Sequence, residues 1–125
     1  MKRIAEELVR LSRDLVGASS WEYSTRWNDD SQIMVVTLEY DFPEVNDLEP
    51  QEKFLERFKA VVSKMQAHAA KMSSKKRPDV VEKVTSRGQV DVGHGRVHLG
   101  VTVEFDNDVE VTESEAESIV EKLVN

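Results

Sequence analysis

The sequence predicts an α+β protein of element order α-ββ-α-ββ-α, with a four-stranded antiparallel sheet and helices packed mainly on one face. Three observations lead to this fold class. Apolar residues recur at helical spacing in three segments, and they alternate with other residues in four more. The chain also matches itself at a shift of 65 residues, so that VTLEYD at 36–41 lies over VTVEFD at 101–106. We therefore expect a duplicated ββα unit, residues 21–76 and 80–124, preceded by a helix at 2–16.

The first and last helices carry clear terminal signals. An apolar stripe predicts the helix at 2–16, and Gly17 is placed to end it. The last helix is expected to begin at a capping box formed by Thr112 and Glu115. In such a box each residue satisfies a backbone N–H group that the first turn leaves unpaired.

The middle helix is predicted over residues 48–76. Its apolar residues from Phe54 to Met72 are spaced 4-3-4-3-4, and Pro50 fits its first turn. A helix of that length spans about 43 Å, whereas a strand of eight residues covers only about 27 Å. We therefore expect its end, residues 66–77, to overhang the sheet.

Two hairpins are predicted from alternating stretches that flank turn sequences. WEYSTRW and QIMVVTLEYDF flank NDDS, and the repeat places GHGR at the equivalent turn of the second hairpin. The expected registers pair Trp27 with Gln32 and Val92 with Val97. The residues expected to face the helices are Trp21, Tyr23, Trp27, Met34, Val36, Leu38, Tyr40, Val90, Val92, Leu99, Val101, Val103 and Phe105.

The second turn raises the question of a metal site. His94, His98 and Asp91 are residue types that bind zinc, and they are the candidates for a zinc site. The expected register places His98 opposite Asp91 on the outer face of the sheet. We interpret this pair as a surface ion pair beside a hairpin bend, and we expect no metal and no cofactor.

Charge is unevenly distributed along a chain whose net charge is −7. The acidic candidates are Glu104, Asp106, Asp108, Glu110, Glu113 and Glu117. Residues 106–117 resemble the first half of a calcium-binding EF-hand loop, but Val111 stands where the sharp turn requires glycine. An acidic turn that leads into a capped helix is therefore the expected structure. The basic candidates, near the end of the long helix, are Lys71, Lys75, Lys76, Arg77 and Lys83. We expect them to form a solvated helix end, a dimer contact or a site for an acidic or phosphate-bearing partner.

The interaction candidates are apolar or titratable residues without an assigned cover. Ile33 and Val35 fall on the outer face of the first hairpin, where either the first helix or another chain covers them. His68 and Met72 lie in the apolar seam of the long helix. Together they favour a surface that binds a partner.

Catalysis is not indicated. The chain has no cysteine, and no serine lies in a nucleophile elbow. It has no apolar run long enough to span a membrane and no secretory signal. We expect an intracellular, cytoplasmic protein of one domain, residues 1–125.

Two resemblances bear on the class of protein. KRIAEELVRLSRDLV, at residues 2–16, is similar to the opening helix of short uncharacterised proteins of tailed bacteriophages. The element order and the acidic charge resemble those of type III secretion chaperones. Those chaperones place three strands before the middle helix, where this chain has two. The first resemblance implies a viral protein, and the second implies a dimeric chaperone.

We therefore predict a non-enzymatic acidic protein-interaction module, a homodimeric accessory, adaptor or chaperone-like factor. The alternative is a nucleic-acid-related protein. It would either bind phosphate through the basic helix end or act as an acidic DNA mimic that inhibits a nucleic-acid-binding protein. The net charge of −7 disfavours nucleic-acid binding because phosphate backbones are repelled.

Overall fold

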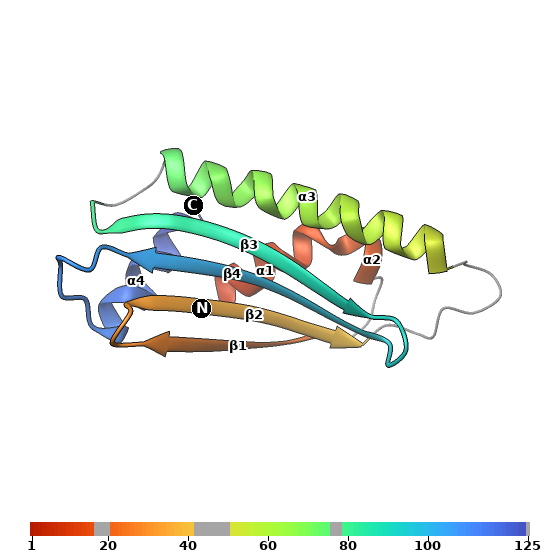
Figure 1. Cartoon of the computed structure of the whole chain (residues 1–125), viewed down its shortest axis with the longest axis horizontal. Coiled ribbons are helices and arrows are strands. Elements are labelled where there is room, and N and C mark those ends of the chain that lie inside the picture. The colour runs from red at the N-terminus through yellow and green to blue at the C-terminus, as the bar shows by residue number, and fades with distance from the viewer. Residues whose placement is uncertain (17–20, 42–50, 76–78, 125) are drawn as a thin grey trace.

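The structure is a computed structural model, and it describes residues 1–16, 21–41, 51–75 and 79–124 (Figure 1). The predicted element order is confirmed. The elements are α1 (Lys2–Leu11), α2 (Arg13–Val16), β1 (Trp21–Asn28), β2 (Ile33–Asp41), α3 (Gln51–Lys75), β3 (Val81–Asp91), β4 (Arg96–Phe105) and α4 (Glu113–Leu123).

The four strands form one open antiparallel sheet in the order β1-β2-β4-β3. The two central strands, β2 and β4, pair so that Val36 lies opposite Val101. These two residues are also equivalent in the sequence repeat. The central strands of the two hairpins are therefore related by a local two-fold axis at this pair. The outer strands do not follow it, because Met34 pairs with Trp27, whereas its repeat equivalent Leu99 pairs with Gly88 rather than with residue 92.

The helices lie on one face of the sheet, and the core fills the space between them (Figure 1). Along β2 and β4, alternate side chains such as Leu38 and Leu99 are fully buried on that face. Helix α1 packs on the same face through Ile4 and Leu8, which belong to the same core. None of the helices in the described ranges is long and apolar enough to cross a membrane.

The first helix is interrupted at Ser12, where a single helix over 2–16 was predicted. The Ser12 hydroxyl donates to the Leu8 carbonyl at 2.8 Å, and the Ser12 N–H contacts the carbonyls of both Leu8 and Val9. A serine that bonds back to the preceding turn competes with the helical ladder. The chain therefore breaks into α1 and α2, and the predicted stop at Gly17 falls outside the described residues.

Both hairpin registers differ from the prediction by two residues. Trp27 pairs with Met34 rather than Gln32, and Val97 pairs with Val90 rather than Val92. The first turn includes Gln32, whose positive φ of 52° takes it out of the strand. The second turn comprises residues 92–95 and closes with Gly95 at a φ of 63°. A shift of two residues keeps each side chain on its predicted face.

Helix α3 lies along the edge strand β3 (Figure 1). The predicted overhang of its C-terminal end is wrong, because Ala69 and Met72 are buried. The physical reason is the length of β3, which has 11 residues. It therefore extends for about 36 Å, close to the roughly 38 Å of a 25-residue helix. The predicted helix residues 48–50 and 76 lie outside the described residues.

The edge strand β1 is covered far less than predicted. Tyr23 pairs with Leu38 and so faces the helix side, yet it is 43% exposed. Trp21 and Trp27 are only partly buried. The described helices lie over β2, β4 and β3 and leave this strand open. Val92, also predicted to face the helices, lies in the second turn.

Candidate functional site

The outer face of the sheet carries no helix among the described residues (Figure 1). The strand registers arrange its side chains in rows across the four strands. The central row is formed by Ser24, Thr37, Gly100 and Arg87. Next to it, Val35 pairs with Thr102. The face is polar, with small residues at its centre.

The sequence left open whether the first helix or another chain covers Ile33 and Val35. Helix α1 packs on the opposite face, where Ile4 is 2% exposed. Ile33 and Val35 are half-buried, and they pair with neighbouring residues of β1 and β4. Both remain accessible to a partner.

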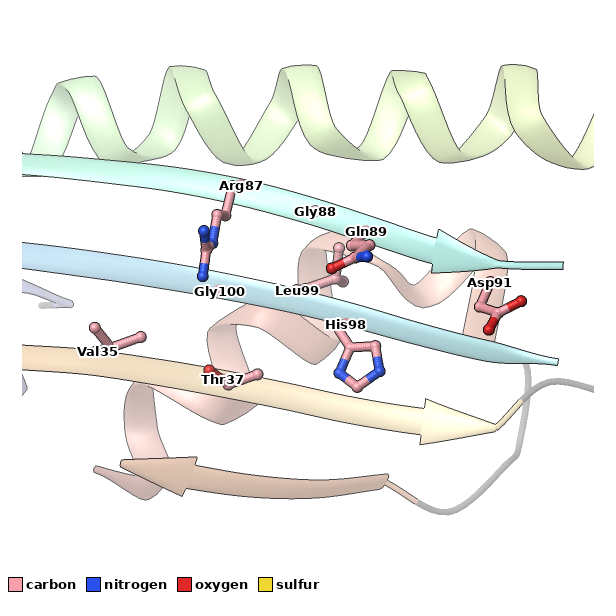
Figure 2. A pocket seen from close by; sticks show the side chains of 9 residues that line it. All are labelled: Val35, Thr37, Arg87, Gly88, Gln89, Asp91, His98, Leu99 and Gly100. Atoms are coloured by element: carbon pink, nitrogen blue, oxygen red, sulfur yellow. The ribbon is translucent and has the colours of Figure 1, made fainter. Parts of the chain in front are cut away.

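A groove of about 480 Å³ lies on this outer face (Figure 2). We call it the Gly100 groove, because Gly100 forms its floor. Arg87 reaches from β3 toward Gly100, while His98 projects from β4 farther along the same strand. The residues that line it are Val35, Thr37, Arg87, Gly88, Gln89, Asp91, His98, Leu99 and Gly100.

Gly100 is not required by the fold. A Cβ added there would meet only the Val36 carbonyl oxygen at 3.6 Å and the Thr37 hydroxyl at 4.0 Å, which are ordinary contacts. Its φ is not positive either. Gly88 on β3 is different, since a Cβ there would lie 2.7 Å from a Val62 methyl group. A glycine inside a strand weakens it and often marks a close approach by a ligand or another backbone.

The groove presents hydrogen-bond donors. Arg87 is exposed, and its guanidinium carries five N–H donors. The Gln89 amide and the His98 ring lie beside it. A guanidinium that flanks an open hollow binds an acceptor such as a carboxylate or a carbonyl oxygen. Val35 adds an apolar wall.

The predicted His98–Asp91 pair is wrong. His98 lies opposite Gln89, and Asp91 lies opposite Arg96. Asp91 instead accepts a hydrogen bond from His94 Nδ1 at 2.6 Å within the turn, and this bond holds the pKa of Asp91 below its usual value. The described residues contain no cluster of three or more side chains able to bind a metal. The three candidates therefore divide between a turn and the Gly100 groove.

Gln32 organises the acidic turn at 106–111, and sequence reasoning did not single it out. Its side-chain amide donates to the carbonyls of Asp106 and Val109 at 2.7 Å each, and its oxygen accepts the Val111 N–H at 2.7 Å. The Asp106 carboxylate accepts the Asp108 N–H at 2.8 Å. The turn is thus held by hydrogen bonds to the Gln32 amide, and residues 106–111 form a turn that leads into α4, as predicted. No sequence signal marked Gln32, because its partners lie more than 70 residues away.

The acidic candidates are spread over three elements. Glu104 lies on the outer sheet face opposite Lys83. Asp106, Asp108 and Glu110 belong to the turn, whereas Glu113 and Glu117 lie on α4. Half of the predicted capping box is confirmed, since the Thr112 hydroxyl accepts the Glu115 N–H at 3.3 Å. The Glu115 carboxylate accepts from the Thr112 hydroxyl at 3.0 Å instead of from the Thr112 backbone N–H.

The interaction candidates of α3 are less accessible than expected. Met72 is 4% exposed and belongs to the core, so it is no surface residue. His68 Nε2 lies 3.5 Å from a carboxylate oxygen of Glu7 on α1 and joins the two helices. A hydrogen bond from Arg10 is the main cause that lowers the pKa of Glu7.

The basic candidates do not form one described surface. Lys71 is exposed on α3. Lys83 lies on the outer face of β3, opposite Glu104. The Lys75 side chain and the residues Lys76 and Arg77 lie outside the described part of the chain.

Comparison with known proteins adds no assignment to this geometry. No protein-family model, curated protein or solved structure matches the chain. The likenesses to phage proteins and to secretion chaperones therefore stay predictions, and the Gly100 groove rests on its own residues.

Proposed function

We propose that the protein is a non-enzymatic protein-interaction module that binds a partner protein at the Gly100 groove. One observation carries the proposal: a central strand holds a glycine that neither backbone conformation nor packing requires, at the floor of an open groove. Such a glycine costs the strand about 0.5–1 kcal/mol relative to alanine. Room for a partner is the gain that offsets this cost.

The groove fits one segment of a partner. Arg87 and Gln89 supply donors, and Thr37 supplies a hydroxyl, on a floor without a side chain. A carboxylate or a backbone carbonyl of the partner accepts from Arg87, while an apolar side chain lies against Val35. These are the features of a specific polar contact with a small apolar anchor.

A protein partner agrees with the charges better than a nucleic acid does. The net charge of −7 opposes a phosphate backbone. The outer face alternates acids and bases, as in the row of Asp41, Arg96 and Asp91. The absence of cysteine suits a role inside the cell. An adaptor or chaperone-like accessory factor, encoded by a cell or by a phage, is the corresponding role.

The test is an affinity capture from a lysate of the source organism, with and without nuclease, followed by mass spectrometry. Three baits are compared: the unaltered protein, Gly100→Val and the control Thr102→Val. Gly100→Val fills the groove with a branched side chain. Thr102→Val makes the same side chain on the same strand and face, but Thr102 does not line the groove.

The unaltered protein and Thr102→Val should capture the same protein in stoichiometric amount, with or without nuclease. Gly100→Val should bind it about tenfold or more weakly, equivalent to about 1.4 kcal/mol. Equal capture by Gly100→Val would refute the groove as the site. Recovery that disappears with nuclease would instead support the nucleic-acid alternative.

A further inference from the structure

The two edges of the sheet are protected differently. The β3 edge has a β-bulge between Val81 and Lys83, carries Lys83 and Arg87, and lies beneath α3. Bulges and charged side chains are the usual means of preventing strand pairing at an edge. Strand β1 pairs with β2 without any register shift, so it has no bulge, and its two charged residues, Glu22 and Arg26, are of opposite sign. Its outer backbone edge has no strand partner among the described residues.

Aromatic side chains stand on the helix side of β1. The rings of Trp21 and Tyr23 lie 6.2 Å apart, and Tyr23 is the most exposed of the large hydrophobic residues in the described ranges. Trp27 packs edge-on against Phe105 at 5.8 Å but stays partly exposed. An edge strand with open aromatic residues has apolar surface to bury when a further strand pairs with it.

The sequence of β1 is complementary to itself. In an antiparallel pair of two β1 strands centred on Ser24, Glu22 of each copy lies opposite Arg26 of the other. The same register places Trp21 opposite Trp27 and Tyr23 opposite Thr25 on the helix side. A register centred on Tyr23 or on Thr25 leaves both charges without opposite charges. Opposite charges and aromatic pairs directly across from each other stabilise antiparallel strands.

We propose that two copies of this chain pair through β1 in the register centred on Ser24. The two four-stranded sheets then form one sheet of eight strands. The inference goes beyond the proposed function and does not depend on it, because the Gly100 groove is built from β2, β4 and β3.

The test uses charge exchange at the two paired positions. Arg26→Glu gives four acids across the interface, and Glu22→Arg gives four bases. A mixture of the two variants restores opposite charges at both positions, since each arginine again faces a glutamate. Lys59→Glu on the exposed surface of α3 is the control for net charge. Sedimentation equilibrium measures the association of each sample, and circular dichroism checks its fold.

The unaltered protein and Lys59→Glu should be dimeric with similar dissociation constants. Each single variant should dissociate about tenfold more readily, and the mixture should recover dimers. A monomer at every soluble concentration would overturn the proposal. Dimers whose dissociation constant is the same in every charge-exchange variant would overturn it as well. Capture of a partner by a monomeric protein would contradict only the dimer, whereas a dimer without a partner would contradict only the proposed function.

Discussion

Gly88 and Gly100 offer the sharpest test of how the fold uses its glycines. They lie on adjacent strands and face opposite sides of the sheet, because Gly88 pairs with Leu99 and Gly100 pairs with Arg87. Gly88 lies beneath α3. A Cβ there would approach Val62 at 2.7 Å, Phe58 at 2.9 Å and Leu99 at 3.1 Å. The change to alanine at each position adds the same single methyl group.

The expected effects have opposite signs. At Gly88 the methyl group overlaps a branched side chain and a ring of α3, so the helix must move away from β3. Overpacking of this kind costs about 1–3 kcal/mol. At Gly100 the nearest atom is 3.6 Å away, and no strain arises. Alanine at this position lowers the conformational entropy of the unfolded chain and should therefore stabilise the protein by about 0.4–1 kcal/mol.

Urea unfolding of Gly88→Ala and Gly100→Ala, monitored by tryptophan fluorescence, measures both effects. A fall in the midpoint for Gly88→Ala with an unchanged m-value would indicate lost stability rather than an altered unfolded state. Equal midpoints for the two variants would refute the close approach of α3 to β3. A large loss at Gly100→Ala would refute the argument that the fold does not need this glycine.

Two further predictions concern buried polar groups. Gln32→Ala should destabilise the protein by about 2–4 kcal/mol in the same urea assay, because the buried Val111 N–H and two carbonyl groups lose their hydrogen-bond partner. A loss below about 0.5 kcal/mol would show that the turn at 106–111 is stable without the Gln32 amide. Burial raises the pKa of Tyr40 to about 12. In the unfolded chain the pKa of a tyrosine is near 10. The contribution of Tyr40 to the free energy of unfolding is therefore fully present below pH 10. It is lost, by about 2–3 kcal/mol, as the pH rises through 12. Tyr40→Phe should remove this alkaline loss, and an identical fall in Tm between pH 9 and 12 for both proteins would contradict it.

The element order was predictable because each element carries its own local signal. The apolar stripe of α3 and the alternation in β2 depend only on the residues within each segment. The repeat also placed Val36 over Val101, and the structure pairs these residues at the centre of the sheet. The predicted faces of the side chains that lie in strands were right, since a register error of two residues does not change them; Val92, which lies in a turn, is the exception.

The registers were not predictable, because a contact distant in sequence sets one of them. Gln32 leaves β2 to bind the turn at 106–111, so the four-residue turn of the first hairpin moves from 28–31 to 29–32 and Asn28 pairs with Ile33. The site shows the same limit. The sequence suggested that His94, His98 and Asp91 form a cluster. In the structure His98 instead pairs with Gln89 and lines the same groove as Gly100. The sequence alone also could not show that Gly88 is required by packing and Gly100 is not, because the difference depends on which side chains pack against each glycine.

The two proposals are linked by one row of residues. Ser24, Thr37 and Gly100 lie side by side across β1, β2 and β4. The proposed two-fold axis passes between the Ser24 residues of the two copies, so the row continues through the second copy to its own Gly100. The two floors are then five strand spacings apart, about 24 Å, on one outer face. A partner with two binding segments at that separation engages both grooves, and the second contact forms at a high effective concentration. Arg26→Glu, which leaves each groove intact, should therefore weaken such a bivalent partner and leave a monovalent one unaffected.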